Sequence, residues 1–218
     1  MRTKNVLRLR YEIRIPLPNK RNYQDTSFLV ANHLEVFFMF KKFSDSAKNL
    51  KDTRVLCTAA VFTALYVVLD MLQIPITPQS RISLTFLPMA VCGWLFGPVP
   101  ALIVGALGDT VGFLIHPTGT YFPGFCITAI LAGLIFGFCL YKRDTHKIIW
   151  WIILSKTLVS VFLNILLNTY WLSILYEKAY FVYMITRIVK NIITLPLEIA
   201  LIFIVITFIS RHGIRKIV

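Results

Sequence analysis

The side chains in this sequence that are best suited to bind a ligand lie inside long apolar stretches. The segment "TRIVKNIITLPLE" carries one such set, in which offsets of 4, 7 and 11 residues separate the first member from the others: Arg187, Asn191, Thr194 and Glu198. A helix with 3.6 residues per turn places these four on one face, and Lys190 flanks it. Polar groups are costly in hydrocarbon and mark functional sites there. We therefore predict that this face points toward protein or water.

Arg187 and Glu198 are too far apart to neutralise each other directly. Three helical turns separate them, about 16 Å along the helix axis. Arg187 lies near the outer end of its helix and is predicted to contact an anionic ligand, and a structural role is the alternative. Pro196 lies on the opposite side of the helix and is predicted to kink it.

The preceding apolar segment carries a second polar stripe with the same periodicity. Its members are Thr157, Ser160, Asn164, Asn168 and Trp171. An amide presents a donor and an acceptor side by side and an indole offers a stacking face, so this set suits a flat, hydrogen-bonding ring. Asn168 and Trp171 lie nearer the outer end and are predicted ligand contacts. For Asn164, a role in joining helices is an equal alternative.

The segment "GDTVGFLIHPTGTYFPGF" interrupts the apolar chain at residues 108–125 with an acid, a histidine, two prolines and several glycines. Asp109 stands near the outer end of one predicted helix, and Asp70 stands at the outer end of another. Either carboxylate is suited to accept hydrogen bonds from a ligand's N–H groups or to pair with Arg81. These alternatives stay open.

The elements that must position these groups are membrane-spanning helices. The chain is 57% hydrophobic and 15% charged, with a mean hydropathy of +0.71, which leaves too little polar surface for a soluble globule of 218 residues. Apolar runs of about 17 to 25 residues match a hydrocarbon core about 30 Å thick, and the lack of alternation indicates helices. We predict an all-α integral membrane protein with six transmembrane helices, at about 54–73, 83–97, 99–115, 124–141, 148–173 and 184–210.

Prolines and basic residues predict the connections between these spans. "FGPVP" joins the second and third spans in a tight hairpin, because Pro98 and Pro100 cannot continue a helix. Basic residues gather before the first span, between the fourth and fifth, and after the sixth, and such loops are typically cytoplasmic. Both termini are therefore predicted to be cytoplasmic, and the segment 108–125 is predicted to lie on the outer face.

The N-terminal part of the chain is predicted to be separate from the membrane domain. Residues 1–52 form a basic extension and cytoplasmic lead-in, and residues 53–218 form the six-helix domain. The extension lacks a long apolar core and a small-residue cleavage site, so it is not a typical signal peptide. Two interpretations of residues 1–38 stay open: a basic arm on the membrane surface, or a start site assigned upstream of a true start at Met39, which we favour.

Several other classes of function are disfavoured. The net charge of +13 is partly explained by the basic cytoplasmic loops, and no aromatic–basic platform accompanies it, so no nucleic-acid binding is expected. The four cysteines lie within predicted spans without ligand-like spacing, so no metal site and no cofactor are expected. A membrane enzyme would need a clustered catalytic set, and a scaffold protein would not need polar stripes inside two helices. No catalytic residue is therefore assigned.

Small residues at regular spacing predict close contacts between helices. They occur at Ala60 and Ala64 in the first span, and in the third and fourth spans at Ala101, Gly105, Gly108, Gly112, Ala129, Gly133 and Gly137. Helices in lipid approach closely where side chains are small. Some of these seams close the bundle, and one that faces outward would serve a partner protein.

Three stretches in order, "FGPVPALIVGALGDTVGFLIHPTGTYFPGF", "NTYWLSILY" and "RIVKNIITLPLE", carry a family resemblance. Over about residues 45–215 the chain resembles the folate-specific substrate-binding (S) components of energy-coupling factor (ECF) transporters. The combination is more specific than any one stretch. It implies an S-component fold that captures folate with high affinity outside a bacterial cell and delivers it inward. An S component for another vitamin is the alternative.

The resemblance also implies partners in a bacterial plasma membrane: a transmembrane coupling subunit and two ABC ATPase subunits. The chain itself is not expected to be an enzyme, which agrees with its lack of a G-x-x-x-x-G-K-[ST] motif. Ala60 and Ala64 resemble the A-x-x-x-A element through which S components meet the coupling subunit.

Folate combines a flat heterocycle with two carboxylates, and the resemblance relates both parts to the residues above. The turn at 119–124 becomes part of the lid and wall of an outward-facing site. The complete set of expected substrate contacts is Arg81, Asp109, Tyr121, Phe122, Asn168, Trp171, Arg187 and Lys190. The aromatic and amide residues suit the ring, and Arg81, Arg187 or Lys190 suits the anionic tail.

Overall fold

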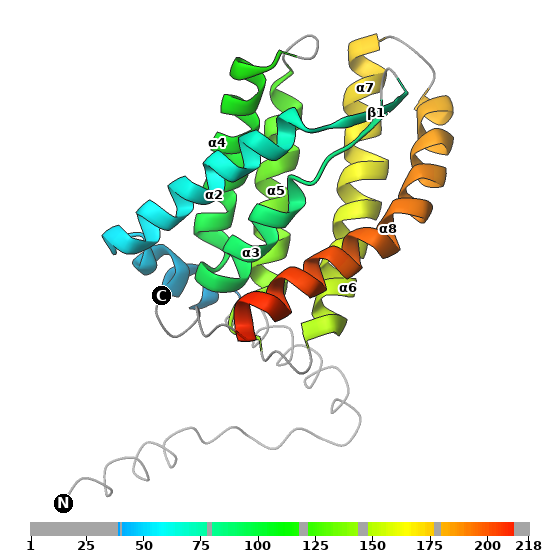
Figure 1. Cartoon of the computed structure of the whole chain (residues 1–218). Coiled ribbons are helices and arrows are strands. Elements are labelled where there is room, and N and C mark those ends of the chain that lie inside the picture. The colour runs from blue at the N-terminus through cyan, green and yellow to red at the C-terminus, as the bar shows by residue number, and fades with distance from the viewer. Residues whose placement is uncertain are drawn as a thin grey trace, which may run out of the picture. The chain divides into compact units, whose positions relative to one another are not determined.

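The structure is a computed structural model that describes residues 39, 41–77, 80–117, 122–143, 148–176 and 180–211. From residue 41 onward, these belong to one compact unit that begins at Phe40. Helices form nearly all of it (Figure 1), and the elements in chain order are α2 (Thr53–Met71), β1 (Ile74–Thr77), β2 (Ser80–Ile82), α3 (Phe86–Phe96), α4 (Pro98–Ile115), α5 (Pro123–Leu140), α6 (Ile148–Leu158), η3 (Val159–Leu167), α7 (Asn168–Tyr176) and α8 (Tyr180–Arg211). Residues 41–49 are also helical. The arm at 1–38 and both termini, whose side of the membrane was predicted, lie outside the described residues.

The apolar helices confirm the predicted helical membrane fold. Within the described residues, five stretches have the length and composition to cross a bilayer: Thr53–Met71, Pro98–Ile115, Pro123–Leu140, Ile148–Leu175 and Arg187–Arg211. The predicted second span is the 11-residue α3, which rises only about 16 Å and is therefore shorter than the hydrocarbon core. A sixth full-length crossing is thus not confirmed, and α3 lies as a buried half-length helix among the long ones.

A short antiparallel hairpin connects α2 to α3, and the sequence did not predict it. Ile74 pairs with Ile82 and Pro75 with Arg81, with an irregular register between Pro75 and Thr77. In Figure 1 the hairpin projects toward the side of the bundle that holds α7 and α8. The structure describes the backbone of Arg81 as part of β2 but does not describe its side chain.

The connection between α3 and α4 is the tight hairpin that the prolines predicted. α3 ends at Phe96, and α4 begins at Pro98, the favoured position for proline in a helix. The single residue between them, Gly97, has φ of 95°, a conformation that side-chain-bearing residues rarely adopt. One glycine is therefore enough to reverse the chain.

The helical stretch at 41–49 packs into this hairpin. The Ser46 hydroxyl donates to the Phe96 carbonyl oxygen at 2.9 Å and accepts from the Val99 N–H at 3.1 Å, and Ser46 is completely buried. The Lys42 ammonium donates to the Phe138 carbonyl oxygen at 3.1 Å. The carbonyl groups near the ends of α3 and α5 are thereby satisfied, and this part of the predicted lead-in contacts the bundle directly.

The seam of small residues between α4 and α5 allows the two backbones to touch. A Cβ atom added to Gly105 would lie 2.6 Å from the Ala129 carbonyl oxygen, and one added to Gly133 would collide with the Ala101 carbonyl oxygen. The predicted role of these residues in closing the bundle is confirmed. The apolar core lies around α3, where Trp94 and Phe96 are almost completely buried.

The face of α8 that carries the polar stripe is turned inward. Asn191 and Thr194 are buried, whereas Ile192 and Ile193 are each 69% exposed and thus face the lipid. This confirms the orientation that the spacing predicted. Pro196 lies inside α8, and Figure 1 shows the helix changing direction along its course, as expected for a proline in a helix interior.

Candidate functional site

The candidate site lies where the long helix Ile148–Leu175 faces α8. This helix consists of α6, η3 and α7 in continuous succession, and η3 is a π-helix of nine residues. At its end the Asn168 N–H donates to the Leu163 carbonyl oxygen, five residues back. A π-helix has more residues per turn than an α-helix and often occurs at functional sites. It therefore changes which residues share a face.

The π-helix makes one part of the sequence interpretation wrong. Thr157, predicted to begin the polar stripe, is exposed. Ser160 is only 1% exposed, and Asn164, Asn168 and Trp171 remain partly buried. The 3.6-residue period thus does not relate Thr157 to the later members of the stripe, because the π-helix Val159–Leu167 lies among them.

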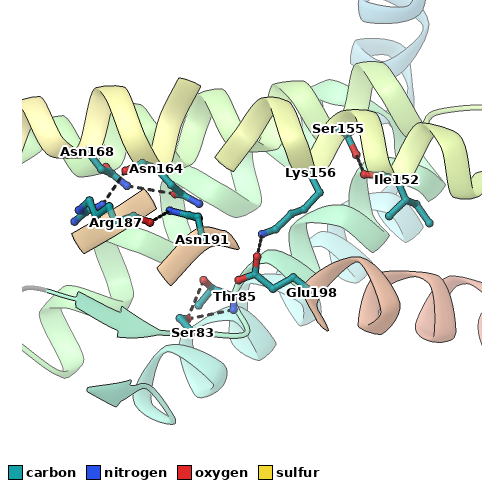
Figure 2. A network of polar contacts seen from close by, with 10 residues as sticks. All are labelled: Ser83, Thr85, Ile152, Ser155, Lys156, Asn164, Asn168, Arg187, Asn191 and Glu198. Atoms are coloured by element: carbon teal, nitrogen blue, oxygen red, sulfur yellow. Dashed lines mark hydrogen bonds and ion pairs between the residues drawn. The ribbon is translucent and has the colours of Figure 1, made fainter. Parts of the chain in front are cut away.

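Arg187 links the two polar stripes (Figure 2). Its Nη1 donates to the backbone oxygen of Asn164 at 3.0 Å, so the guanidinium of α8 is held against η3. The Asn168 amide nitrogen lies 3.5 Å from the Asn164 side-chain oxygen, and the Asn191 amide donates to the Arg187 carbonyl oxygen at 2.8 Å. A guanidinium has five N–H donors, so this contact leaves Arg187 with donors for a further acceptor.

Aromatic rings from two helices meet beside this network. The rings of Phe122, just before α5, and Trp171, on α7, have centroids 5.4 Å apart, and Tyr170 contacts Trp171 at 5.2 Å. A Cβ atom added to Gly124 would lie 2.5 Å from the Phe122 ring and 2.6 Å from the Trp171 ring. The glycine therefore allows the two aromatic side chains to approach, and sequence analysis gave it no such role.

Several buried polar atoms of these helices have no hydrogen-bond partner among the described residues, and two of them belong to residues at the aromatic rings. These two are the Asn168 side-chain oxygen, an acceptor, and the Trp171 indole nitrogen, a donor. A buried polar atom without a partner is unfavourable by about 1–3 kcal/mol. One donor and one acceptor beside aromatic faces are suited to a planar ligand with complementary groups.

A buried ion pair lies next to the network and was missed in the sequence analysis. The Lys156 ammonium on α6 is 3.0 Å from a carboxylate oxygen of Glu198 on α8, and the two side chains are only 3% and 13% exposed. The Lys156 nitrogen also lies 4.0 Å from the centroid of the Phe86 ring. Glu198 thus has a partner on another helix. A single lysine within an otherwise apolar span was the signal that would have found it.

The relatives of this chain decide its family. Residues 54–206 match the family described as "ECF transporter, substrate-specific component". The chain belongs to this family. It is thus an S component, as the resemblance of its motifs implied.

Two curated relatives of this S component are each named "Folate transporter FolT". The protein from Clostridium novyi (strain NT) is 39% identical over 127 residues, which cover 58% of this chain and 73% of that protein. The protein from Leuconostoc mesenteroides subsp. mesenteroides (strain ATCC 8293) is 31% identical over 173 residues, which cover 76% of this chain and 92% of that protein.

Two solved structures resemble the S component. "Crystal structure of FolT bound with folic acid" matches with a TM-score of 0.63 and 35% identity, covering 69% of this chain and 90% of that chain. "Structure and mechanism of the S component of a bacterial ECF transporter" matches with a TM-score of 0.59 and 23% identity, covering 74% and 97%. The second likeness concerns the fold alone.

The remaining predicted site residues of the S component fall into separate places. Lys190 is partly buried on α8 and interacts electrostatically with Arg187, Glu198 and Lys156. Asp109 lies on α4 and interacts electrostatically with Asp70, and in Figure 1 α4 lies on the other side of α5 from α7 and α8. Tyr121 and the side chain of Arg81 lie outside the described part of the chain.

The alanine pair of the S component faces outward. Ala60 and Ala64 are both exposed on α2, and the neighbouring Val61 and Leu65 are 66% and 44% exposed. The seam between α4 and α5 closes the bundle, so the two kinds of small-residue seam are separated in space. The α2 face has the small side chains that allow a helix to approach in lipid.

Proposed function

We propose that this S component binds folate outside a bacterial cell and passes it inward as part of an ECF importer in the plasma membrane. The observation that carries the proposal is the 35% identity with the FolT protein whose crystal structure has folic acid bound. The names of the two curated relatives agree with it. Neither fact depends on the residues that we assign to the site.

The geometry at α7 supports a site for the pterin ring. Phe122 and Trp171 offer aromatic surfaces, and the Asn168 oxygen and Trp171 nitrogen offer an acceptor and a donor without partners in the described residues. The pterin is flat and carries both donors and acceptors. We assign the ring to these three residues, and their arrangement favours them over Asp109. Tyr121, which lies outside the described residues, is assigned to the ring on the family resemblance.

The basic groups on α8 support a site for the anionic tail. Arg187 is attached to η3 through one of its N–H groups, and Lys190 lies one turn away on the same helix. Carboxylates accept charge-assisted hydrogen bonds from such groups, which are stronger than neutral ones. We assign the two carboxylates to Arg187, Lys190 and Arg81 without pairing each carboxylate with one residue.

We further propose that transport depends on a coupling subunit and two ATPase subunits. The chain has no phosphate-binding G-x-x-x-x-G-K-[ST] motif, so ATP hydrolysis is assigned to partners and the S component is not an enzyme. The exposed Ala60 and Ala64 on α2 are assigned to the contact with the coupling subunit.

The ligand carried through purification tests this proposal. The full chain is expressed in cells grown with a complete set of vitamins, purified in detergent, denatured, and its small molecules are identified by mass spectrometry. We expect folate in amounts close to that of the protein. Another vitamin in its place would contradict the folate assignment and leave the family membership intact.

A further inference from the structure

The ion pair between Lys156 and Glu198 is not used by the ligand site described above. Its two side chains are almost completely buried, and the Lys156 ammonium is packed against the Phe86 ring. Neither charge is among the residues assigned to the ligand, although Lys190, which is assigned to its tail, interacts electrostatically with both. The pair needs a different explanation from that of a ligand contact.

A buried ion pair is weak evidence for stability. Apolar residues of similar volume often replace such a pair without loss of stability, and the best-attested use of buried charges is to specify one arrangement of helices. In lipid this argument gains force, because the helices are not driven together by the hydrophobic effect. We therefore consider which arrangement the pair specifies.

Among the described residues, two polar contacts join α8 to the long helix that faces it, in addition to the packing between these helices. Arg187 on α8 contacts the Asn164 backbone in η3, and Glu198 on α8 contacts Lys156 in α6. The later residue of α8 meets the earlier residue of the facing helix, so the two helices run antiparallel (Figure 2). Two polar contacts at different levels of α8 restrict its rotation and axial position more than either contact alone.

Pro196 makes the second contact important. It lies inside α8 between Arg187 and Glu198, removes one backbone hydrogen bond and favours a bend there. The two halves of α8 can then be oriented separately. Glu198 lies two residues after the proline, so its pairing with Lys156 holds the half of α8 after the bend. Arg187 holds the half before the bend, and the two contacts together therefore set the angle between the halves.

We propose that Lys156 and Glu198 are positioning residues that fix the bend and rotation of α8, so that Arg187 reaches Asn164 and faces the ligand. The role of Arg187 toward the ligand rests on the proposed function. The role of the pair in placing α8 does not, and it is measured without ligand.

The central variant replaces both charges with apolar residues, Lys156→Met together with Glu198→Leu. The charge-reversed variant, Lys156→Glu together with Glu198→Lys, is its matched control, because it restores an ion pair at the same place. Each full-length variant is compared with the wild type by thermal unfolding, by hydrogen–deuterium exchange, and by calorimetry with folate and with pteroate, which lacks the glutamate.

We expect the apolar variant to unfold near the wild-type temperature, to exchange faster on both sides of Pro196, over residues 192–203 of α8, and to bind folate at least about tenfold more weakly. Tenfold is on the order of one lost hydrogen bond to a charged group. Its affinity for pteroate should change less than its affinity for folate, because Arg187 is assigned to the tail. The charge-reversed variant should recover slow exchange and most of the folate affinity.

The proposal is overturned if the apolar variant keeps wild-type exchange in α8, or if it loses folate and pteroate affinity equally. If the apolar variant does not fold, Lys156→Gln together with Glu198→Gln takes its place with the same expectations. A wild-type chain that does not bind folate would refute the proposed function, and the exchange measurements would still decide whether the pair positions α8.

Discussion

Replacing Arg187 with alanine tests the assignment of the anionic tail. The Arg187 side chain is partly buried, and one of its N–H groups donates to the Asn164 carbonyl oxygen of η3. The remaining donors are therefore held in a defined direction before a ligand arrives. A hydrogen bond to a charged group contributes about 1.5–3 kcal/mol, so Arg187→Ala should weaken folate binding by about 10- to 150-fold.

Calorimetry with purified wild-type and variant chains measures this loss. The same titration with pteroate should show a much smaller effect, because pteroate lacks the glutamate that Arg187 is assigned to hold. Arg187→Lys keeps the charge and loses the forked geometry, so it should fall between the wild type and the alanine variant. Ile193→Ala on the lipid-facing side of α8, where Ile193 is 69% exposed, is the matched control and should leave both affinities unchanged. Equal losses for folate and pteroate in Arg187→Ala would show that the residue is structural or contacts the ring.

Four further changes test other parts of the account. Gly124→Val should push apart the two aromatic rings beside it and lower pteroate affinity in calorimetry by about tenfold, or about 1.4 kcal/mol; unchanged affinity would remove those rings from the site. Gly97→Ala should lower stability in detergent by about 1–3 kcal/mol, because φ is 95° there and the new methyl group would meet a buried serine. Enlarging Ala60 and Ala64 to leucine should leave folate binding intact and sharply lower both uptake and co-purification with the coupling subunit; normal uptake would refute the assigned interface. Removing residues 1–38 should leave insertion and binding intact, and loss of binding in a correctly inserted protein would show that they belong to the fold.

The sequence predicted the long helices and their hairpin because those features depend on local chemistry. Long apolar runs have few alternatives in a membrane protein, and Pro98 could only begin a new helix after Gly97. The inward direction of the polar stripe on α8 was predictable for the same reason, because Asn191 and Thr194 repeat with the period of the helix. The length of α3 was not, since hydropathy does not distinguish a buried half-length helix from a crossing.

The parts that the sequence did not predict depend on contacts between distant residues. Lys156 and Glu198 lie on different helices, and no spacing rule pairs them. The π-helix from Val159 to Leu167 changes which side chains share a face, yet its composition is that of an ordinary apolar helix. This is why Thr157 was assigned to the wrong face. The candidate site was therefore predictable as a set of residue types, and its arrangement required the structure.

Titration of folate into the purified, ligand-free chain tests the central claim most directly. The account predicts saturable, high-affinity binding of one folate per chain in the absence of any coupling subunit or ATPase, and much weaker binding of riboflavin, thiamine and biotin. Absence of folate binding by a correctly folded chain, or tighter binding of one of the other vitamins, would contradict it.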